Sequence, residues 1–391
     1  MNPETPRVAF FNRSYWPDAE ATGQLLVELC EDLVPEFRPV VLPGRPNADL
    51  SGLPEGAWKK TRERNGVEIL RVPHSRFHKR HWLGRAVNWA TFAVAAFFRG
   101  LFMRRPAAIV VETDPPMLCL VGLVLKYWHR AKFVVYLQDI YPDVAVVLRG
   151  LSEGRFTRLL RRLFVAAYKR ADRVVVLSRD MKEFLVSCGV RCERIAIIPN
   201  WVDAKLVRPV KTDNPFRKRE GLDGKFVAMY SGNLGFAQRL ENVLEAAALL
   251  KDRTDIVFLM VGDGASKRRL EALAAERKLA NVRFLGYQPK EELAASLSAA
   301  DLHLVPLHPQ VLRFLMPSKI YGILAAGTAA LVVSPPGTEL ARLVEENGVG
   351  FTAPPDDPIA FAEAVRRAAD DPAKLAEMGE RGYRLALSDF D

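Results

Sequence analysis

The sequence predicts an α/β protein built from two doubly wound, Rossmann-like domains, each a parallel sheet covered by helices. Three observations lead to this expectation. Short apolar runs alternate with segments of helical spacing, one polar stretch interrupts the alternation, and the alternation then begins again. A chain of 391 residues also exceeds what one ordinary hydrophobic core organises, so two domains are expected from length alone.

Buried strands are expected in the first half of the chain at residues 7–11, 39–43, 107–112, 132–137, 173–178 and 195–200. The segments between them have helix-like spacing, which predicts parallel strands covered on both faces. Residues 205–224 are polar and aperiodic, so we interpret them as a linker. The expected domains are therefore residues 1–204 and 225–391.

After this linker, strands are expected at residues 225–233, 255–262, 281–286, 302–307 and 329–334. Ligands of such sheets bind outside the carboxyl ends of the strands, and a site is expected in the cleft between two facing domains. The residues that directly follow each strand are therefore the informative ones.

The composition is that of a folded basic protein, with 49% hydrophobic residues, 26% charged residues and a formal net charge of +10. The positive charge predicts an anionic partner, which could be nucleic acid, anionic lipid or a phosphorylated substrate. The four cysteines are typical of a reduced, cytoplasmic protein, and Cys188 and Cys192 have no histidine nearby to indicate zinc. The apolar stretches 86–98 and 116–125 are too short to span a bilayer, and the N-terminal sequence has no signal-peptide pattern.

Glycine-containing turns follow the strands of the second half. Gly232 and Gly235 follow the first of them, "GDGA" begins at Gly262, and "GYQPKEEL" begins at Gly286. With the "MPSK" segment, four helix N-termini are expected at one sheet edge, which suits a diphosphate that carries a sugar and a base. Each turn by itself is typical of an ordinary βα connection, so the prediction depends on their order and spacing.

The stretch "MPSKIYGILAAGT" (316–328) predicts a short apolar helix with a charged start. Pro317 suits the first turn of a helix and Gly327 suits its end. Ser318 and Lys319 are then expected in the opening turn, where free N–H groups and the helix dipole favour an anion. The alternative is a capped core helix that carries one solvated lysine.

Several motifs together resemble a known family. "YSGNLG", "VGDG", "NVRFLGYQPKEEL", "ADLHLVPL", "PSKIYGILAAGT" and "GTELARLV" occur in the order and spacing of family 4 glycosyltransferases of the GT-B fold. "SYWPDAEATGQLLVELCEDL" (14–33) is also similar to that family, and "QDIYPD" (138–143) resembles the branch that builds bacterial polysaccharides and O-antigens. The resemblance spans nearly the whole chain and implies a metal-independent, retaining transferase without a cofactor, with a nucleotide-sugar donor, expected to be UDP-linked, on the C-terminal domain.

The donor contacts that this resemblance implies follow the C-terminal strands: Gly232, Asn233, Leu234, Gly235, Arg239, Gly262, Asp263, Gly286, Tyr287, Pro317, Ser318 and Glu339. The sequence also departs from the family. The usual E-x7-E pair falls at Phe314 and Gly322, and the usual phosphate-binding lysine of the "SGNLG" helix is Gln238. Lys319 is then the best remaining cation for the diphosphate, and Glu339 is the nearest carboxylate for sugar or ribose hydroxyls.

Acceptor-side residues are expected after the N-terminal strands. Thr22 and Gly23 stand at a helix start, where the family brings backbone against the donor phosphate or the acceptor. Asp139 occupies the region where many relatives carry a catalytic histidine, and a carboxylate there could orient or deprotonate an acceptor hydroxyl. The alternative is that Asp139 only caps the following helix.

The segment 155–170 predicts a basic amphipathic helix. An apolar stripe that includes Phe156 and Phe164 lies opposite Arg155, Arg158 and Arg162. With a basic and aromatic cluster at 74–85 that contains Trp82, it suggests a peripheral protein on the inner face of the cell membrane, acting on a polyprenyl-linked or saccharide acceptor. The alternative is a solvated basic helix whose apolar stripe lies in the core.

Three function classes compete at this point. The first is the membrane-associated glycosyltransferase, the second a nucleotide-sugar epimerase of the same fold, and the third an inactive transferase-like partner subunit, which the missing glutamates keep open. Nucleic-acid binding ranks lower because the basic residues lie beside apolar helices and not among exposed stacking aromatics. No metal site is expected, since the one Asp-x-Asp is Asp389–Asp391 at the chain end.

Overall fold

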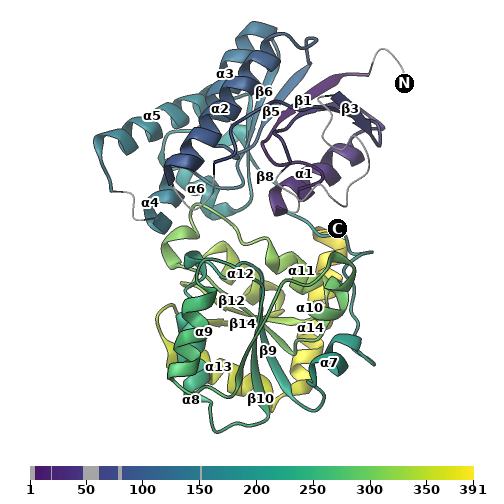
Figure 1. The fold of residues 1–391 in the computed structure, drawn as a ribbon, viewed down its shortest axis with the longest axis vertical. Helices are drawn as coiled ribbons and strands as arrows, with labels where there is room; N and C mark the ends of the chain where they lie inside the picture. The colour runs from purple at the N-terminus through teal and green to yellow at the C-terminus, as the bar shows by residue number, and fades with distance from the viewer. Residues whose placement is uncertain (1–4, 19, 47–60, 78–81, 150–151) are drawn as a thin grey trace. The chain divides into compact units, whose positions relative to one another are not determined.

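The computed structural model describes residues 5–18, 20–46, 61–77, 82–149 and 152–391 (Figure 1). The chain divides into two compact units, Met1–Ile198 and Pro199–Asp391. Each unit contains one predominantly parallel sheet with helices packed on it. Among the helices of the described residues, none combines the length and apolar character that crossing a bilayer requires.

The first unit is built on an eight-stranded sheet of order β3-β4-β2-β1-β5-β6-β7-β8. Its strands are β1 (Arg7–Phe11), β2 (Arg38–Leu42), β3 (Thr61–Arg64), β4 (Val67–Leu70), β5 (Ala108–Val111), β6 (Lys132–Tyr136), β7 (Arg173–Val176) and β8 (Ile195–Ile197). Its helices are α1 (Ala21–Asp32), α2 (Trp82–Leu101), α3 (Leu118–His129), α4 (Asp143–Arg149), α5 (Arg155–Arg170), α6 (Arg179–Ser187) and the 3₁₀ turn η1 (Cys192–Arg194). Every strand pair is parallel except β3 with β4.

Burial on both faces explains why the strands of this sheet are continuous apolar runs. In β1, Val8 and Phe10 pack in one core cluster with Leu26 and Cys30 of α1, while the alternate residue Phe11 is also fully buried. α2, α3 and α5 lie together on the face opposite α1 (Figure 1).

The hairpin of β3 and β4 was not predicted from the sequence. β3 is the charged run "TRER", which carries no apolar alternation. The turn between the strands places Asn65 and Gly66 at φ values of 49° and 81°, the positive pair that a two-residue hairpin turn requires. The Asn-Gly dipeptide is therefore the signal in the sequence that could have revealed this hairpin.

The second unit is built on a six-stranded sheet of order β11-β10-β9-β12-β13-β14, in which every pair is parallel. Its strands are β9 (Phe226–Ser231), β10 (Ile256–Val261), β11 (Val282–Leu285), β12 (Leu302–Pro306), β13 (Ala329–Val333) and β14 (Gly350–Ala353). Its helices are α7 (Pro215–Glu220), α8 (Glu241–Leu249), α9 (Lys267–Glu276), α10 (Leu293–Ser298), α11 (Lys319–Ala325), α12 (Glu339–Asn347), α13 (Pro358–Asp370) and α14 (Pro372–Asp389), with 3₁₀ turns η2 (Phe236–Gln238), η3 (Lys290–Glu292) and η4 (Pro309–Val311).

The polar segment 205–224, expected to be a linker, lies within the second unit and contains helix α7. Asn214 caps α7 by accepting from the N–H groups of Phe216 and Arg217, and the Phe216 ring is buried. The Lys211 ammonium donates to Thr328 Oγ1 at 2.8 Å. The polar side chains of this segment therefore bond to its own unit, which the absence of apolar periodicity did not predict.

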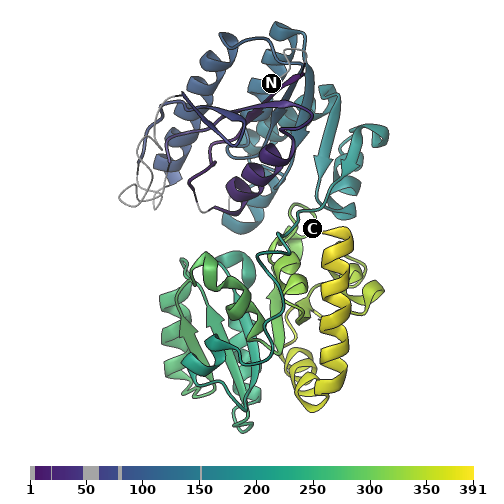
Figure 2. The same ribbon diagram turned by 90° about the vertical axis from the view of Figure 1, so that its right-hand side faces the viewer.

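The C-terminal helix α14 packs along α11 in the second unit (Figure 2). The Phe390 ring lies 4.9 Å from the Tyr321 ring, measured between centroids, and the Asp391 carboxylate accepts from the Ala204 N–H at 3.1 Å. These contacts tie the last two residues of the chain to the second unit.

Candidate functional site

Two glycine-containing loops meet at the carboxyl edge of the second sheet. Gly232 and Gly262 follow β9 and β10 with φ values of 136° and 138°. A Cβ atom on Gly262 would lie 2.0 Å from the Gly232 carbonyl oxygen, and one on Gly264 would lie 2.5 Å from the Leu234 oxygen. Only glycine allows this approach of backbone to backbone. The contact, together with the bond from Leu234 N–H to Asp263 O at 2.8 Å, fixes the 232–235 loop.

The "MPSK" segment enters the site through a short helix. α11 begins at Lys319, and Ser318 stands in the N-cap position without a side-chain cap bond. Pro317 therefore precedes the helix and does not fill its first turn as predicted. The Tyr321 N–H donates to the Ser318 carbonyl at 3.3 Å, which is a tight i to i+3 turn. Because α11 has only seven residues, the lysine side chain matters more here than the helix dipole.

The Lys319 ammonium is buried beside the glycine loop. Its Nζ lies 3.7 Å from the centroid of the Tyr230 ring and 3.1 Å from where a Cβ on Gly232 would stand. Within the described residues it has no hydrogen-bond partner, and burial lowers its pKa to about 7. The Tyr230 hydroxyl donates to the Asn233 carbonyl at 2.7 Å and so ties this ring to the loop. The alternative of a solvated lysine is therefore wrong, and the ammonium lacks the anionic partner that such burial requires.

Other predicted donor residues follow strands of the same sheet. The Tyr287 ring is 61% exposed, and its hydroxyl donates to the Asp263 carbonyl at 3.3 Å. Gly286 faces open space, so no packing contact requires a glycine there. Glu339 is the first residue of α12, which Thr338 caps.

Two residues near the loops differ from what the family pattern implied. The Arg239 guanidinium forms an ion pair with Asp356 at 2.7 Å, so its charge is already partnered. Gln238 Oε1 is buried and has no hydrogen-bond partner among the described residues. A Cβ on Gly235 would lie 3.1 Å from this oxygen and 2.8 Å from Asn233 Nδ2. The amide of Gln238 thus faces the loop at the place where a lysine was expected.

In the first unit, the loop after β1 meets the start of α1. Gly23 is buried, and a Cβ there would lie 2.7 Å from Ser14 Oγ, so a larger residue would push helix and loop apart. Thr22 precedes it in the first turn and is half-buried. The Arg13 guanidinium pairs with Asp114 at 2.9 Å and joins this loop to the one after β5.

Asp139 lies at the same edge, three residues after β6. Its N–H donates to Thr113 Oγ1 at 3.4 Å. Helix α4 begins only at Asp143, so Asp139 lies outside the N-cap position of that helix. The capping alternative is therefore contradicted by the position of the helix start.

A buried carboxyl group at this edge was missed. Glu112 directly follows β5 and is 3% exposed, and its Oε2 has no hydrogen-bond partner within the described residues. Burial raises the pKa of Glu112 well above its usual value, and the neighbouring Asp114 raises it further. Tyr136 Oη is likewise buried at this edge. An acidic residue at the end of an apolar strand was the available signal, but it was assigned to the strand.

The helix α5 exposes much of its apolar stripe. Phe156, at 71% exposure, is accessible together with Leu159 and Leu163. Phe164 belongs to the stripe but is buried, as are Thr157, Ala167 and Tyr168 of the same helix. Arg155, Arg158 and Arg162 are exposed as predicted. The alternative that the stripe lies in the core is therefore wrong for its three exposed members.

The basic cluster at 74–85 is only partly described. Residues 78–81 lie outside the described residues, as does the side chain of Trp82, the first residue of α2. The residues that the structure describes include no group of three or more histidine, cysteine or acidic side chains arranged to hold a metal ion.

Two protein-family models match the chain. Residues 26–206 match "Glycosyltransferase Family 4" and residues 212–385 match "Glycosyl transferases group 1". A probable glycosyltransferase, WbjE of Pseudomonas aeruginosa, is 34% identical over 264 residues, which are 67% of this chain and 66% of that protein. A putative colanic acid biosynthesis glycosyl transferase, WcaI of Escherichia coli, is 29% identical over 376 residues, 93% of this chain and 92% of the relative.

Solved structures share the fold. Sucrose-phosphate synthase from Thermosynechococcus elongatus aligns with a TM-score of 0.80 at 20% identity, covering 99% of this chain and 95% of that one. Anabaena HepE, determined in complex with UDP-glucose, aligns with a TM-score of 0.73 at 19% identity, covering 99% and 96%. The two parallel α/β units therefore have the GT-B fold, as predicted.

Proposed function

Because the chain belongs to the group 1 and family 4 glycosyltransferases, we propose that it transfers a sugar from a nucleotide-sugar donor to a lipid-linked or saccharide acceptor in cell-surface polysaccharide synthesis. The single observation that carries the donor part is the buried, unpartnered ammonium of Lys319 against the loop that begins at Gly232. A donor diphosphate would supply the missing anion.

In the proposed reaction, the bond between the anomeric carbon and the diphosphate oxygen breaks, and its electron pair goes to that oxygen. Negative charge therefore develops on the leaving diphosphate. The Lys319 ammonium and the N–H groups of the 232–235 loop stabilise this charge from fixed positions, at a site where burial strengthens each interaction. The acceptor hydroxyl oxygen forms the new bond to the anomeric carbon, with retention of configuration.

The lowered pKa of Lys319 fits an anionic ligand. Without ligand the ammonium loses its proton near pH 7, because burial penalises the charge. A bound diphosphate raises the pKa again, so donor binding takes up a proton above that pH. Donor affinity is then expected to fall by about tenfold for each pH unit above the native pKa.

We propose that the base of the donor stacks on the exposed ring of Tyr287, beside the Asp263 backbone. A UDP-linked donor is supported by the structural neighbour HepE, which was determined with UDP-glucose. Glu339, at the start of α12, is proposed to bind sugar or ribose hydroxyls.

For the acceptor side we propose Thr22, Gly23 and Asp139, which lie at the carboxyl edge of the first sheet. Asp139 is proposed to orient the acceptor hydroxyl and take its proton. The exposed Phe156, Leu159 and Leu163, next to the arginines of α5, support peripheral binding to an anionic membrane on the cytoplasmic side, where a polyprenyl-linked acceptor would be found.

The donor part is tested by a thermal-shift screen of nucleotides and nucleotide sugars, because a ligand of the native state raises its apparent stability. The ligand that raises the unfolding temperature is then used in a turnover assay that measures release of nucleoside diphosphate with and without acceptor. Acceptor-dependent release supports transfer. Conversion of the donor sugar without acceptor would instead identify an epimerase, and binding without any turnover would identify an inactive partner subunit.

The membrane part is tested with vesicles. Replacing Arg155, Arg158 and Arg162 by glutamate should release the protein from anionic vesicles without lowering its unfolding temperature, since each basic residue near such a surface contributes about 1 kcal/mol. Wild-type protein that ignores anionic vesicles at low salt would contradict membrane association.

A further inference from the structure

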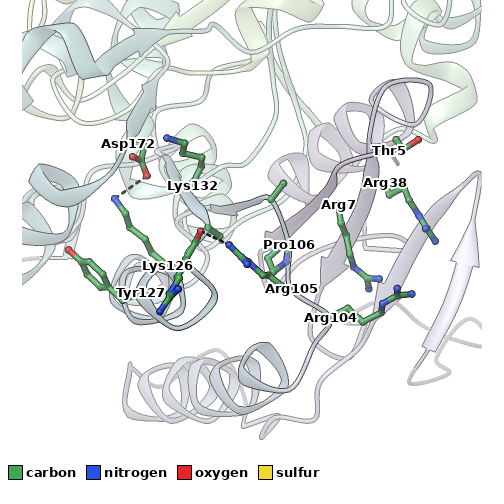
Figure 3. A pocket seen from close by; sticks show the side chains of 13 residues that line it. Thr5, Arg7, Arg38, Arg104, Arg105, Pro106, Lys126, Tyr127, Lys132 and Asp172 are labelled. Carbon is green, nitrogen blue, oxygen red and sulfur yellow. Dashed lines mark hydrogen bonds and ion pairs between the residues drawn. The ribbon is translucent and has the colours of Figure 1, made fainter. Parts of the chain in front are cut away.

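A pocket of about 810 Å³ opens at the amino edge of the first sheet, where its parallel strands begin (Figure 3). Arg7, Arg38 and Lys132 line it from the first residues of β1, β2 and β6. The proposed acceptor residues Gly23 and Asp139 lie after the carboxyl ends of these strands. The pocket is therefore separate from the proposed reaction site.

The pocket has a strong excess of positive charge. Seven of its lining residues are arginine or lysine, and Asp172 is the one acidic residue among them. The Arg7 guanidinium pairs with Glu68 at 2.8 Å, yet its Nε is buried without a hydrogen-bond partner in the described part of the chain. Burial lowers the pKa of Arg7, and repulsion from Arg104 and Arg38 lowers it further. The cations thus repel one another at close range.

Some of these cations have ordinary structural partners at helix ends. Lys126 pairs with Asp172 at 3.0 Å and donates to the carbonyl of Arg170, the last residue of α5, at 2.8 Å. Arg105 donates to the carbonyl of Arg130 at 3.4 Å, and Figure 3 shows the Lys126 side chain turned toward Asp172. Basic residues commonly satisfy helix C-termini in this way.

The remaining cations have no such explanation. The side chains of Arg38, Arg104, Arg130 and Lys132 make no hydrogen bond or ion pair within the residues that the structure describes. Four cations without partners therefore line one concave site, and two of them also repel the Arg7 guanidinium. A bound phosphate group would reduce this repulsion and give the guanidinium and ammonium groups an anionic partner.

Three exposed aromatic residues, which we call the aromatic rim, are lining residues of the pocket or lie within two positions of one in the sequence. Tyr127 lines the pocket, Trp128 next to it is 63% exposed, and Phe102 after α2 is 80% exposed. The Trp128 indole N–H donates to the Leu101 carbonyl at 3.1 Å, which holds its ring against the end of α2. Aromatic side chains with a polar anchor are typical of the boundary between lipid and water.

We propose that this pocket binds the phosphate of an anionic phospholipid, whose acyl chains lie on the aromatic rim of Phe102, Tyr127 and Trp128. The proposal rests on the membrane association proposed above and adds a specific headgroup site to it. The unpartnered cations account for the phosphate, and the adjoining exposed rings account for the choice of a lipid over a free phosphate.

The test uses a soluble lipid, dihexanoyl phosphatidylglycerol below its micelle concentration, titrated into the full chain by calorimetry. Wild-type protein should bind one molecule saturably. The double variant Arg104→Ala and Arg130→Ala should bind about 25-fold more weakly, since each basic residue contributes about fivefold. The control Lys251→Ala and Lys278→Ala removes the same charge from exposed positions of the second unit and should bind like wild type.

Two results would overturn the proposal. If wild type and the Arg104/Arg130 double variant bind the soluble lipid with equal affinity, the pocket is not the lipid-binding site. If wild type binds inorganic phosphate or glycerol phosphate as tightly as the soluble lipid, the pocket is a site for free phosphate and not for a lipid. The α5 variant with three glutamates separates this proposal from membrane association, because it should lose vesicle binding yet bind the soluble lipid normally. Soluble-lipid binding by a wild type that ignores vesicles would leave the pocket standing and refute membrane association.

Discussion

The carboxyl edges of the two sheets carry similar groups in opposite settings. Each edge has a buried ionisable side chain and a tyrosine near a strand end. At the second sheet, Lys319 borders a glycine loop and Tyr287 is exposed. At the first sheet, Glu112 and Tyr136 are both enclosed, at 3% and 5% exposure. The same topology thus places Lys319 beside a loop that can receive a ligand, whereas it encloses Glu112 within the core.

Burial shifts both pKa values toward the neutral form, but the consequences differ. Lys319 has a lowered pKa of about 7, so a nearby anion readily restores its charge. Glu112 has a raised pKa through burial and the repulsion of Asp114, so it stays protonated inside the unit. Four predictions follow from this comparison, and those on Lys319 and Glu112 test whether the first serves the reaction and the second the stability of the fold.

The largest expected effect is that of Lys319→Met on turnover. Methionine keeps much of the bulk but removes the charge that stabilises the leaving diphosphate, so kcat should fall by about 100-fold or more. Donor affinity should fall less if the charge acts mainly in the transition state. The assay is acceptor-dependent release of nucleoside diphosphate. Near-normal turnover by the variant would make Lys319 a structural residue.

The pH dependence of stability provides a control for the Lys319→Met variant. The unfolded chain keeps the lysine proton up to its usual pKa of 10.5, whereas the native protein loses it near 7. Wild-type stability therefore rises with pH across this interval, and the methionine variant should lack that rise. Denaturant titrations at several pH values measure it, and a folded variant with reduced turnover separates chemistry from folding.

The second prediction compares two glycines of the donor edge. Gly262→Ala puts a Cβ against the Gly232 backbone at a φ of 138°, so unfolding should become easier by about 2 kcal/mol and donor binding should weaken. Gly286→Ala adds its Cβ in open space and should change stability little. Equal destabilisation of both variants, measured by denaturant unfolding, would show that the loop contact is not what selects glycine.

The sequence predicted those parts of the fold that local patterns specify. Strands such as β1 and β10 were found because burial on both faces makes them continuous apolar runs. Strand β3 and helix α7 were missed because their charged residues bond within their own unit and leave no apolar periodicity. The turns at Gly232 and Gly262 were placed by their position after strands, but their mutual contact joins residues thirty positions apart.

The character of the site residues was harder to predict than their position. Lys319 was expected as a cation near a phosphate, but its burial depends on the Tyr230 ring, which lies far away in the sequence. Glu112 was assigned to a strand because a single sequence does not show whether a carboxylate at a strand end is solvated. Such environments are set by tertiary packing, which spacing alone does not contain.

The third prediction concerns Glu112. The unfolded chain loses the glutamate proton near the usual pKa of 4.5, whereas the native protein keeps it to higher pH. The contribution of Glu112 to wild-type stability should therefore fall by about 1.4 kcal/mol for each pH unit above 4.5, until the native group ionises. Glu112→Gln cannot ionise and should remove this slope while leaving donor affinity unchanged. Denaturant titrations across this pH range measure the free energy of unfolding of both proteins. If it changes with pH in the same way for wild type and Glu112→Gln, Glu112 is not neutral in the native protein.

The smallest expected effect separates the two tyrosines. Stacking of a base on an aromatic ring contributes at least about 1 kcal/mol, so Tyr287→Ala should weaken nucleoside diphosphate binding by about fivefold or more. Tyr287→Phe removes only the 3.3 Å bond to the Asp263 carbonyl and keeps the ring, so it should bind nearly as tightly as wild type. Tyr136→Phe removes a buried hydroxyl from the other sheet and should leave the Kd unchanged. Calorimetric titration of the three variants checks this, because a loss in Tyr287→Phe as large as in Tyr287→Ala would assign the effect to the hydroxyl and exclude stacking.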